Sequence, residues 1–412
     1  MTRRSRVLPA VLATAVLTIA ACGGGGDSAE GGDTTLTLLS WDNEEIMTPL
    51  IDAFEQAHPD IAVEVSYSPP VAEYIQTLQT RVLSGTAPDV FLIAAENKTN
   101  LIEGGHVLDL AGEDFLANVP EFNQQTYGAD GAVYGLSLAS WGAGIVYNKE
   151  LLAQAGAEAP PRDWDEFLDL CAELKAAGVT PYLEAVDGIP FIVAAFLGAH
   201  DASLGHTMDD EIFAGDSTFE EHWTPVLEQY YRLYDEDLVT PDTVGLTGDQ
   251  VQSEFANGNV AMMVAGPWTI GPLREQAPDL EFEMVPIPGV EGGEPYFAGA
   301  ASPGYAINPE SENVEAARTL LGFLSSPEGV ETFQTASNAI TVTDDFQPEI
   351  DEALAPIVEN VRAGDVYLPQ IAWQRAEDIL NVEATAQIQL MVQGQLTPRE
   401  VAQALDRKLA SS

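Results

Sequence analysis

The sequence predicts a protein of two α/β lobes, and three observations carry this prediction. Its 412 residues exceed the roughly 250–300 residues at which a single hydrophobic core stops growing. Apolar strand patterns alternate with helical patterns over the first third of the chain, which is typical of a mostly parallel sheet covered by helices. Two stretches of small residues, 141–144 and 299–302, suit hinge crossovers between lobes because glycine tolerates backbone rotation.

The first lobe begins with strands and helices in alternation. Leu50, Ile51 and Phe54 recur at helical spacing until Pro59 stops the helix, and the next segment alternates apolar and polar residues as a half-buried strand does. The expected strands are 36–40, 61–65 and 89–93, and the expected helices are 48–57, 71–83 and the start of one at 98–103.

The second lobe starts after the first crossover. Asp163 and Glu166 lie three residues apart in an N-cap signature, and Gly178 ends that helix. Strands are expected at 145–147 and 260–264, and helices at 190–197, 224–234 and 250–257. We expect the N-terminal lobe to comprise 34–140 plus 303–345, and the C-terminal lobe 145–298 plus 350–412.

The charge balance excludes some partners. Sixteen basic residues face 65 acidic ones, a formal charge of -49, so the summed field repels phosphate backbones and anionic lipid headgroups. Nucleic acid is therefore not expected as a partner. Neutral ligands are unaffected by this field and cationic ligands are favoured by it.

The N-terminus carries an export signal. Three arginines precede the apolar run 7–20, which is too short to span a bilayer. The run ends in LTIAAC, which resembles a bacterial lipobox and implies cleavage of a signal peptide (1–21) and diacylation of Cys22. Residues 22–33 are glycine-rich and predict a flexible tether. The expected location is the outer face of the cytoplasmic membrane; an ordinary secretory signal with a chance cysteine is the alternative.

Cofactor and metal motifs are not found in the sequence. Cys171 has no partner cysteine in the mature chain and lies at helical spacing with Phe167 and Leu174, which predicts a small core residue. No nucleotide-binding glycine loop of the Walker or dinucleotide type occurs. The histidines are scattered and predict no metal set; they are His58, His106, His200, His206 and His222.

Polar residues follow two of the predicted parallel strands. In open α/β sheets ligands bind beyond the carboxyl ends of strands. This rule points to Trp41, Asp42 and Asn43 after the first strand, and to Glu96 and Asn97 after the third. For Asp42 the alternative role is a helix N-cap.

Seven motifs in a fixed order carry a family resemblance. They are FEQAHPDIAV (54–63), GTAPDV (85–90), GGHVLDL (104–110), YNKELL (147–152), WDEF (164–167), FANGNVAM (255–262) and GPW (266–268). With the lipobox in front, the chain resembles the family 1 extracellular solute-binding proteins, the carbohydrate-binding lipoproteins of ABC importers. The resemblance implies a periplasmic-binding-protein-like fold, a monomer whose two lobes close on a sugar, and delivery of that sugar to permease subunits. It implies no catalysis and no cofactor.

The resemblance also implies further site residues. A sugar needs polar side chains for its hydroxyls and aromatic rings against its C–H faces. The residues so assigned are Trp141, Asp187, Phe191, Trp268, Gly299, Ala300, Gln370, Trp373 and Arg375. Trp268 matches the family's stacking tryptophan together with its flanking residues. The aromatic register around 373 is shifted, so one of Trp373 and Arg375 is expected to face the ligand.

Two alternatives remain open at this stage. A secreted glycoside hydrolase also combines aromatic rings with paired carboxylates, but 65 acids make any single pair uninformative. A lipoprotein of the same fold that binds a polyamine or an oligopeptide agrees with the acidic balance. Identification of a co-purified ligand separates these classes.

Overall fold

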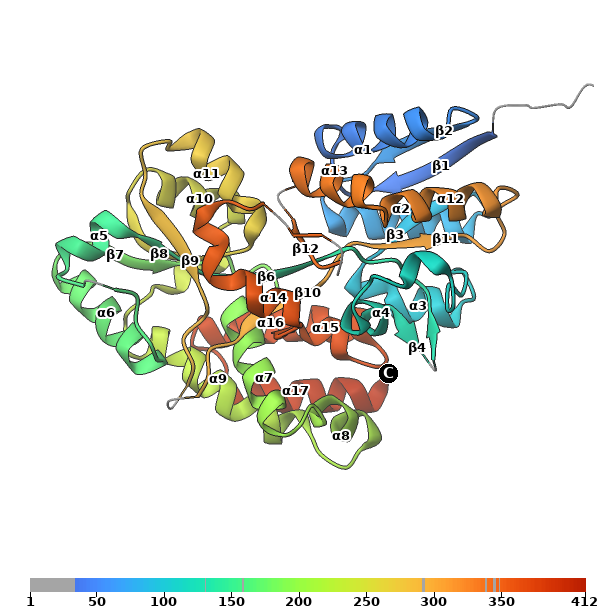
Figure 1. The fold of residues 1–412 in the computed structure, drawn as a ribbon. Coiled ribbons are helices and arrows are strands. Elements are labelled where there is room, and N and C mark those ends of the chain that lie inside the picture. The colour runs from blue at the N-terminus through green and yellow to red at the C-terminus, as the bar shows by residue number, and fades with distance from the viewer. Residues whose placement is uncertain are drawn as a thin grey trace, which may run out of the picture.

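The computed structural model describes residues 34–129, 131–157, 159–290, 293–337, 339–343, 346–347 and 349–412. Two α/β lobes lie side by side (Figure 1), as the sequence predicts. The predicted signal peptide, Cys22 and the tether lie outside the described residues.

The N-terminal lobe is built on a four-stranded sheet of order β11-β3-β1-β2. β1 pairs in parallel with both β2 and β3, so this part of the predicted parallel sheet is confirmed. β11 pairs antiparallel with β3 and is the edge strand of the sheet on that side. The strands are β1 (Thr34–Ser40), β2 (Ile61–Tyr67), β3 (Val90–Ile93) and β11 (Gly304–Ile307), with a separate pair β4 (Gly128–Ala129) and β5 (Ala132–Val133).

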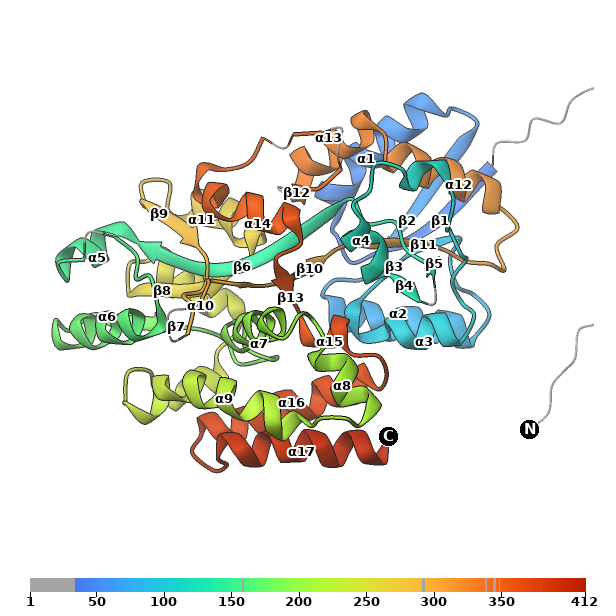
Figure 2. The same ribbon diagram turned by 60° about the horizontal axis from the view of Figure 1, so that its bottom comes forward.

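Helices cover both faces of this sheet, with α1 and α13 on one face and α2 on the other (Figure 2). α1 buries Met47, Leu50 and Phe54, and these recur at helical spacing as expected. The helices are α1 (Glu44–Ala57), α2 (Val71–Leu83), α3 (Lys98–Glu103), α4 (Glu121–Thr126), α12 (Val314–Leu324) and α13 (Pro327–Ser337).

The C-terminal lobe has a mixed sheet, in contrast to the mostly parallel sheet predicted from the first third of the chain. β6 pairs antiparallel with β8, β9, β10 and β12, while β7 and β8, and β10 and β13, are parallel. The strands are β6 (Ala139–Asn148), β7 (Thr180–Leu183), β8 (Val260–Ala265), β9 (Phe282–Val285), β10 (Phe297–Ala301), β12 (Ile340–Thr341) and β13 (Val366–Tyr367).

Successive side chains of β6 pack into two different hydrophobic clusters, because side chains alternate between the two faces of a strand. Ile145 and Tyr147 join one cluster with Trp164 and Trp223, and Val146 joins another with Met263. Asp163 caps α6 by accepting the Glu166 amide at 2.9 Å, which confirms the predicted helix start.

Most helices of the molecule belong to this lobe. They are α5 (Lys149–Gln154), α6 (Trp164–Ala176), α7 (Phe191–Ser203), α8 (Met208–Ala214), α9 (Phe219–Asp235), α10 (Gly248–Ala256), α11 (Ile270–Gln276), α14 (Val358–Ala363), α15 (Pro369–Ala372), α16 (Glu377–Val392) and α17 (Pro398–Ser411). Short 3₁₀ turns are η1 (Ala95–Asn97), η2 (Asp114–Leu116), η3 (Pro241–Gly245), η4 (Pro267–Thr269) and η5 (Glu352–Ile357). No helix within the described ranges is long and apolar enough to cross a membrane.

Both predicted crossover stretches fall on one pair of strands. β6 extends from the C-terminal lobe toward the N-terminal lobe (Figure 2), and β10 pairs with it so that Gly299 faces Gly142 and Ala300 faces Trp141. A Cβ on Gly299 would lie 2.0 Å from the Trp141 carbonyl oxygen. The glycine is therefore needed for close approach of the two strands.

We predict that Gly299→Ala lowers the free energy of unfolding by at least about 2 kcal/mol, because the added methyl forces β10 away from β6. Urea unfolding measures this difference. Gly322→Ala in α12 is the matched control: its Cβ would meet nothing within 4 Å, and alanine stabilises a helix by roughly 0.5–1 kcal/mol over glycine. Equal effects of the two substitutions would contradict the close-approach explanation.

Candidate ligand-binding site

A cavity of about 520 Å³ lies between the two lobes, with walls from both and a base formed by β6 and β10. Its volume falls within the roughly 300–1,000 Å³ of small-molecule sites. The sequence-predicted residues that line it are Trp41, Asp42, Glu96, Trp141, Phe191, Trp268, Ala300 and Gln370. Segments far apart in the chain thus meet at one place.

Three aromatic rings form one wall of the cavity. Trp141 lies 5.2 Å from Trp268 and 5.7 Å from Phe191 between ring centroids, and the Phe191 and Trp268 centroids are 6.3 Å apart. Trp268 sits in η4 directly after β8 and keeps 53% of its surface exposed. An indole left this open at a cavity wall offers an apolar face to a ligand.

The N-terminal lobe contributes acidic groups to the cavity lining. Asp42 follows β1, and its Oδ2 atom is buried with no hydrogen-bond partner. Burial raises the pKa of Asp42 from 3.8 to about 6. Burial also raises the pKa of Glu96, and the charge of Glu377 adds to that shift.

Gln370 supplies a further polar group from the C-terminal lobe. It sits in the short helix α15, and its Oε1 atom is buried without a partner. Unsatisfied buried acceptors at Asp42 and Gln370 suit a ligand that donates hydrogen bonds. No lysine, arginine or histidine is among the described residues that line the cavity, so an anionic ligand has no counter-charge there.

Two predicted residues next to the acidic groups have local roles instead. The Asn43 side chain accepts the Ile46 amide at 3.1 Å and caps α1, the role that was the alternative for Asp42. Asn97 is 1% exposed, and its Oδ1 accepts the Ala94 amide at 3.0 Å. Neither lines the cavity; Asn97 holds the turn that presents Glu96.

Trp373 and Arg375 both lie outside the cavity lining, so the structure places neither where one was expected. Trp373 is fully buried and stacks on Trp223, with centroids 6.0 Å apart, in the C-terminal lobe core. Arg375 donates to the Phe213 carbonyl oxygen at 3.1 Å and lies over the Phe213 ring. Both side chains pack instead against aromatic residues of α8 and α9, Arg375 on Phe213 and Trp373 on Trp223.

Asp187 and Gly299 also lie outside the lining. Asp187 is exposed in the segment before α7, and Gly299 serves strand pairing. The sequence reasoning missed Tyr127, whose hydroxyl donates to the Ala301 carbonyl oxygen at 2.8 Å. It also missed Leu368 and Ile371, which lie close to Gln370 in the sequence. The family resemblance that identified Gln370 could have identified these two residues as well. No sequence pattern around Tyr127 indicates a place at the site.

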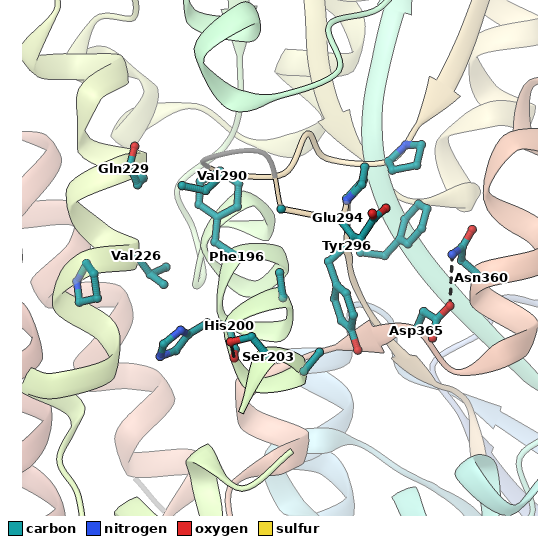
Figure 3. A pocket seen from close by; sticks show the side chains of 17 residues that line it. Phe196, His200, Ser203, Val226, Gln229, Val290, Glu294, Tyr296, Asn360 and Asp365 are labelled. Atoms are coloured by element: carbon teal, nitrogen blue, oxygen red, sulfur yellow. Dashed lines mark hydrogen bonds between the residues drawn. The ribbon is translucent and has the colours of Figure 1, made fainter. Parts of the chain in front are cut away.

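A larger cavity of about 960 Å³ lies within the C-terminal lobe, between α7, α9 and the segment before β10. Figure 3 shows Phe196 and His200 on α7, Val226 on α9 and Tyr296 before β10 around this cavity, and Asn360 is bonded to Asp365 at 3.1 Å. None of the sequence-predicted ligand residues lines it, and it carries none of the described buried polar atoms that lack partners. The interlobe cavity is therefore the better candidate site, despite its smaller volume.

Two α/β lobes with a ligand-sized cavity between them define the class of bilobal solute-binding proteins. Residues 40–331 match the sequence profile of the family described as bacterial extracellular solute-binding protein. The chain belongs to this family, and the predicted fold and family are confirmed.

Individual relatives agree with this assignment. The structure of a family 1 extracellular solute-binding protein from Bifidobacterium longum subsp. infantis is 30% identical, with a TM-score of 0.79 over 92% of this chain and 100% of that one. The multiple sugar-binding protein of Streptococcus mutans is 23% identical over 75% of each chain. The melibiose/raffinose/stachyose-binding protein MelE of Bacillus subtilis is 22% identical over 96% of this chain and 94% of its own.

The buried carboxyl of Asp42 predicts a pH-dependent stability. Because its pKa is about 6 in the folded state against 3.8 ordinarily, the folded protein retains a proton that the unfolded chain loses between these values. The free energy of unfolding therefore falls as pH rises through this window, and the penalty persists at neutral pH. Asp42→Asn should raise the free energy of unfolding by about 1–3 kcal/mol at about pH 7 and change it little near pH 3.5.

Urea unfolding at both pH values measures the effect of Asp42→Asn. Asp52→Asn on the exposed side of α1 is the control, and it should change stability by less than about 0.5 kcal/mol. A stabilisation by Asp42→Asn of the same size at both pH values would show that the carboxylate charge is not its cause.

Proposed function

We propose that this protein captures a neutral oligosaccharide between its lobes outside the cytoplasm and delivers it to the permease subunits of an ABC importer. The observation that carries the proposal is the half-exposed Trp268, which is grouped with Trp141 and Phe191 and lines one cavity with Asp42 and Glu96. Aromatic faces and hydrogen-bond acceptors in one cavity match the two kinds of surface that a sugar ring offers.

The relatives support a sugar as the ligand class. The Streptococcus mutans relative is named for multiple sugars, and the Bacillus subtilis relative for melibiose, raffinose and stachyose. The proposed function includes no chemical change of the sugar, so the bound sugar should be recovered intact.

Closure of the lobes about β6 and β10 completes the proposed mechanism. Gly142 and Gly144 lie in β6 where the predicted crossover falls. A ligand shifts a conformational equilibrium only by its differential affinity for the two states. A sugar that contacts Asp42 on one lobe and Trp268 on the other binds most tightly to an arrangement that brings both residues to one cavity, as the present arrangement does, and it disfavours arrangements with the lobes further apart.

A cationic solute, such as a polyamine or a basic oligopeptide, is the second candidate. The acidic cavity lining and the formal charge of -49 favour it. The aromatic wall with a half-exposed indole favours a sugar over an aliphatic polyamine, although aromatic faces also attract cations. Calorimetric titration separates the two, because spermidine binding weakens with salt and neutral sugar binding does not.

The test of the proposed function is a titration of the protein with raffinose, stachyose, maltotriose and spermidine, together with mass spectrometry of any co-purified ligand. Saturable binding of at least one neutral sugar, recovered unchanged, is the expected result. Binding of spermidine alone would favour the second candidate, and a hydrolysed sugar would point to the hydrolase alternative.

Trp268→Ala should weaken binding of the sugar by roughly 2–4 kcal/mol, as truncation of an aromatic anchor does. A buried indole removes a large apolar area from water at about 25 cal/mol per Å², whereas a single hydrogen bond nets only about 0.5–1.5 kcal/mol. Because Trp268 is 53% exposed, the melting temperature of the unliganded variant should hold.

Trp373→Phe is the matched control for Trp268→Ala, because Trp373 is fully buried outside the cavity. It should lower the melting temperature and leave affinity within about threefold of the wild type. If Trp268→Ala kept its affinity while losing thermal stability, Trp268 would be a core residue and the cavity wall would be misplaced.

We also propose that acylation of Cys22 anchors the protein to the outer face of the cytoplasmic membrane. The lipobox with its glycine tether supports this, and a diacylglyceryl group plus an N-linked chain supplies the two lipid signals that stable anchoring needs. Cys22→Ala should release the protein from the detergent-extracted membrane fraction or block its processing. Cys171→Ala should leave anchoring unchanged because Cys171 is buried; unchanged membrane recovery of Cys22→Ala would refute the anchor.

A further inference from the structure

One of the contacts between the lobes outside the strands is made where η1 and α3 of the N-terminal lobe meet α15 and α16 of the C-terminal lobe. Both ribbon views place α15 beside the N-terminal lobe (Figures 1 and 2). The contact adjoins the ligand cavity, because Glu96 in η1 and Gln370 in α15 both line it.

Two hydrogen bonds cross between the lobes at this contact. The Lys98 ammonium donates to the Ile371 carbonyl oxygen at 2.7 Å. The Thr99 backbone amide donates to Glu377 Oε1 at 2.8 Å. Both donors belong to the first turn of α3, and the preceding Asn97 makes no side-chain cap there, so the C-terminal lobe supplies the acceptor that this amide lacks within its own lobe.

The charges at this contact complement one another. Burial lowers the pKa of Lys98, and the nearby Glu377 carboxylate opposes that shift. Glu377 is 1% exposed, so its carboxylate would be left without compensation if Lys98 and the Thr99 amide moved away.

The backbone before Glu377 is held in an uncommon conformation. Ala376 has φ = 56° and ψ = 24°, a left-handed region that non-glycine residues seldom adopt and that marks functional sites when the surrounding structure maintains it. This conformation directly precedes Glu377 at the start of α16, and Glu377 bonds to the other lobe.

We propose that Lys98 and Glu377 form an interlobe clamp that stabilises the present arrangement of the lobes and so increases ligand affinity. The clamp consists of the Lys98–Ile371 and Thr99–Glu377 hydrogen bonds. Lys98 lies two positions after Glu96, and Ile371 itself lines the cavity next to Gln370. The clamp therefore fixes the distance between Glu96 on one lobe and Gln370 on the other.

The affinity effect rests on the proposed function, because it needs a ligand that contacts both lobes. The effect on lobe spacing does not, since the two hydrogen bonds exist without a ligand. A protein whose binding-competent arrangement is only partly populated binds with an affinity reduced by that fraction. Loss of the clamp should thus widen the lobe spacing and weaken binding together.

The test compares Lys98→Met, Glu377→Gln and Glu377→Ala with the wild type. Lys98→Met keeps the apolar stem and removes the donor. Glu377→Gln keeps an oxygen acceptor for the Thr99 amide but loses the charge, whereas Glu377→Ala loses both. We expect Lys98→Met to weaken binding of raffinose, or of the tightest sugar of the titration panel, by about 5- to 20-fold, and Glu377→Ala to exceed Glu377→Gln.

Lobe spacing is measured by spin-label distances between Cys residues placed at the exposed Glu73 in α2 and Glu228 in α9, in a Cys22→Ala background. Without sugar, the clamp variants should show longer or broader distances than the wild type. Saturating sugar should restore the wild-type distance in the variants.

Lys408→Met is the matched control, because Lys408 pairs with Glu383 at 3.2 Å within the C-terminal lobe. It should change neither the affinity by more than about twofold nor the distance. Wild-type distances and affinities in both Lys98→Met and Glu377→Ala would overturn the clamp. If the wild type bound no sugar, the proposed function would fail, and the ligand-free distances alone would still decide the clamp.

Discussion

The antiparallel pairing of β6 with β10 is the constraint on which the rest of the molecule depends. These two strands bring Trp141 and Ala300 to the base of the cavity and put Gly142 opposite Gly299. Because a Cβ at Gly299 would collide with the Trp141 carbonyl oxygen, small residues at this register are a condition of the fold.

The aromatic and the polar groups that line the cavity each carry a free-energy cost, for different physical reasons. Trp268 leaves apolar surface in water, which costs free energy until a ligand covers it. Asp42 and Gln370 leave buried acceptors unpaired, which also costs free energy until a donor arrives. Binding of a molecule with both C–H faces and hydroxyls would remove both costs at once.

Hydrogen bonds beside the cavity hold in place the residues that line it. Glu96 is presented by a turn that the Asn97 side chain holds through the Ala94 amide, and the next turn is bonded to the C-terminal lobe through Lys98. Asn97 was assigned to ligand contact from its place after the third strand. Its position is near the ligand site, but its side chain stabilises the turn, a distinction that strand topology alone does not make.

Local signals in the sequence determined part of this protein: the cap at Asp163 and the helical spacing in α1 each depend on neighbouring residues and backbone geometry. The mixed sheet of the C-terminal lobe depends on pairing between segments far apart in the chain, and no local pattern encodes strand direction. Trp268 and Trp373 show the same limit at single residues. Both are tryptophans in segments assigned to the site, yet one is 53% exposed at the cavity and the other is fully buried against Trp223. Only the tertiary structure decided between them, because burial depends on which distant surfaces each indole meets.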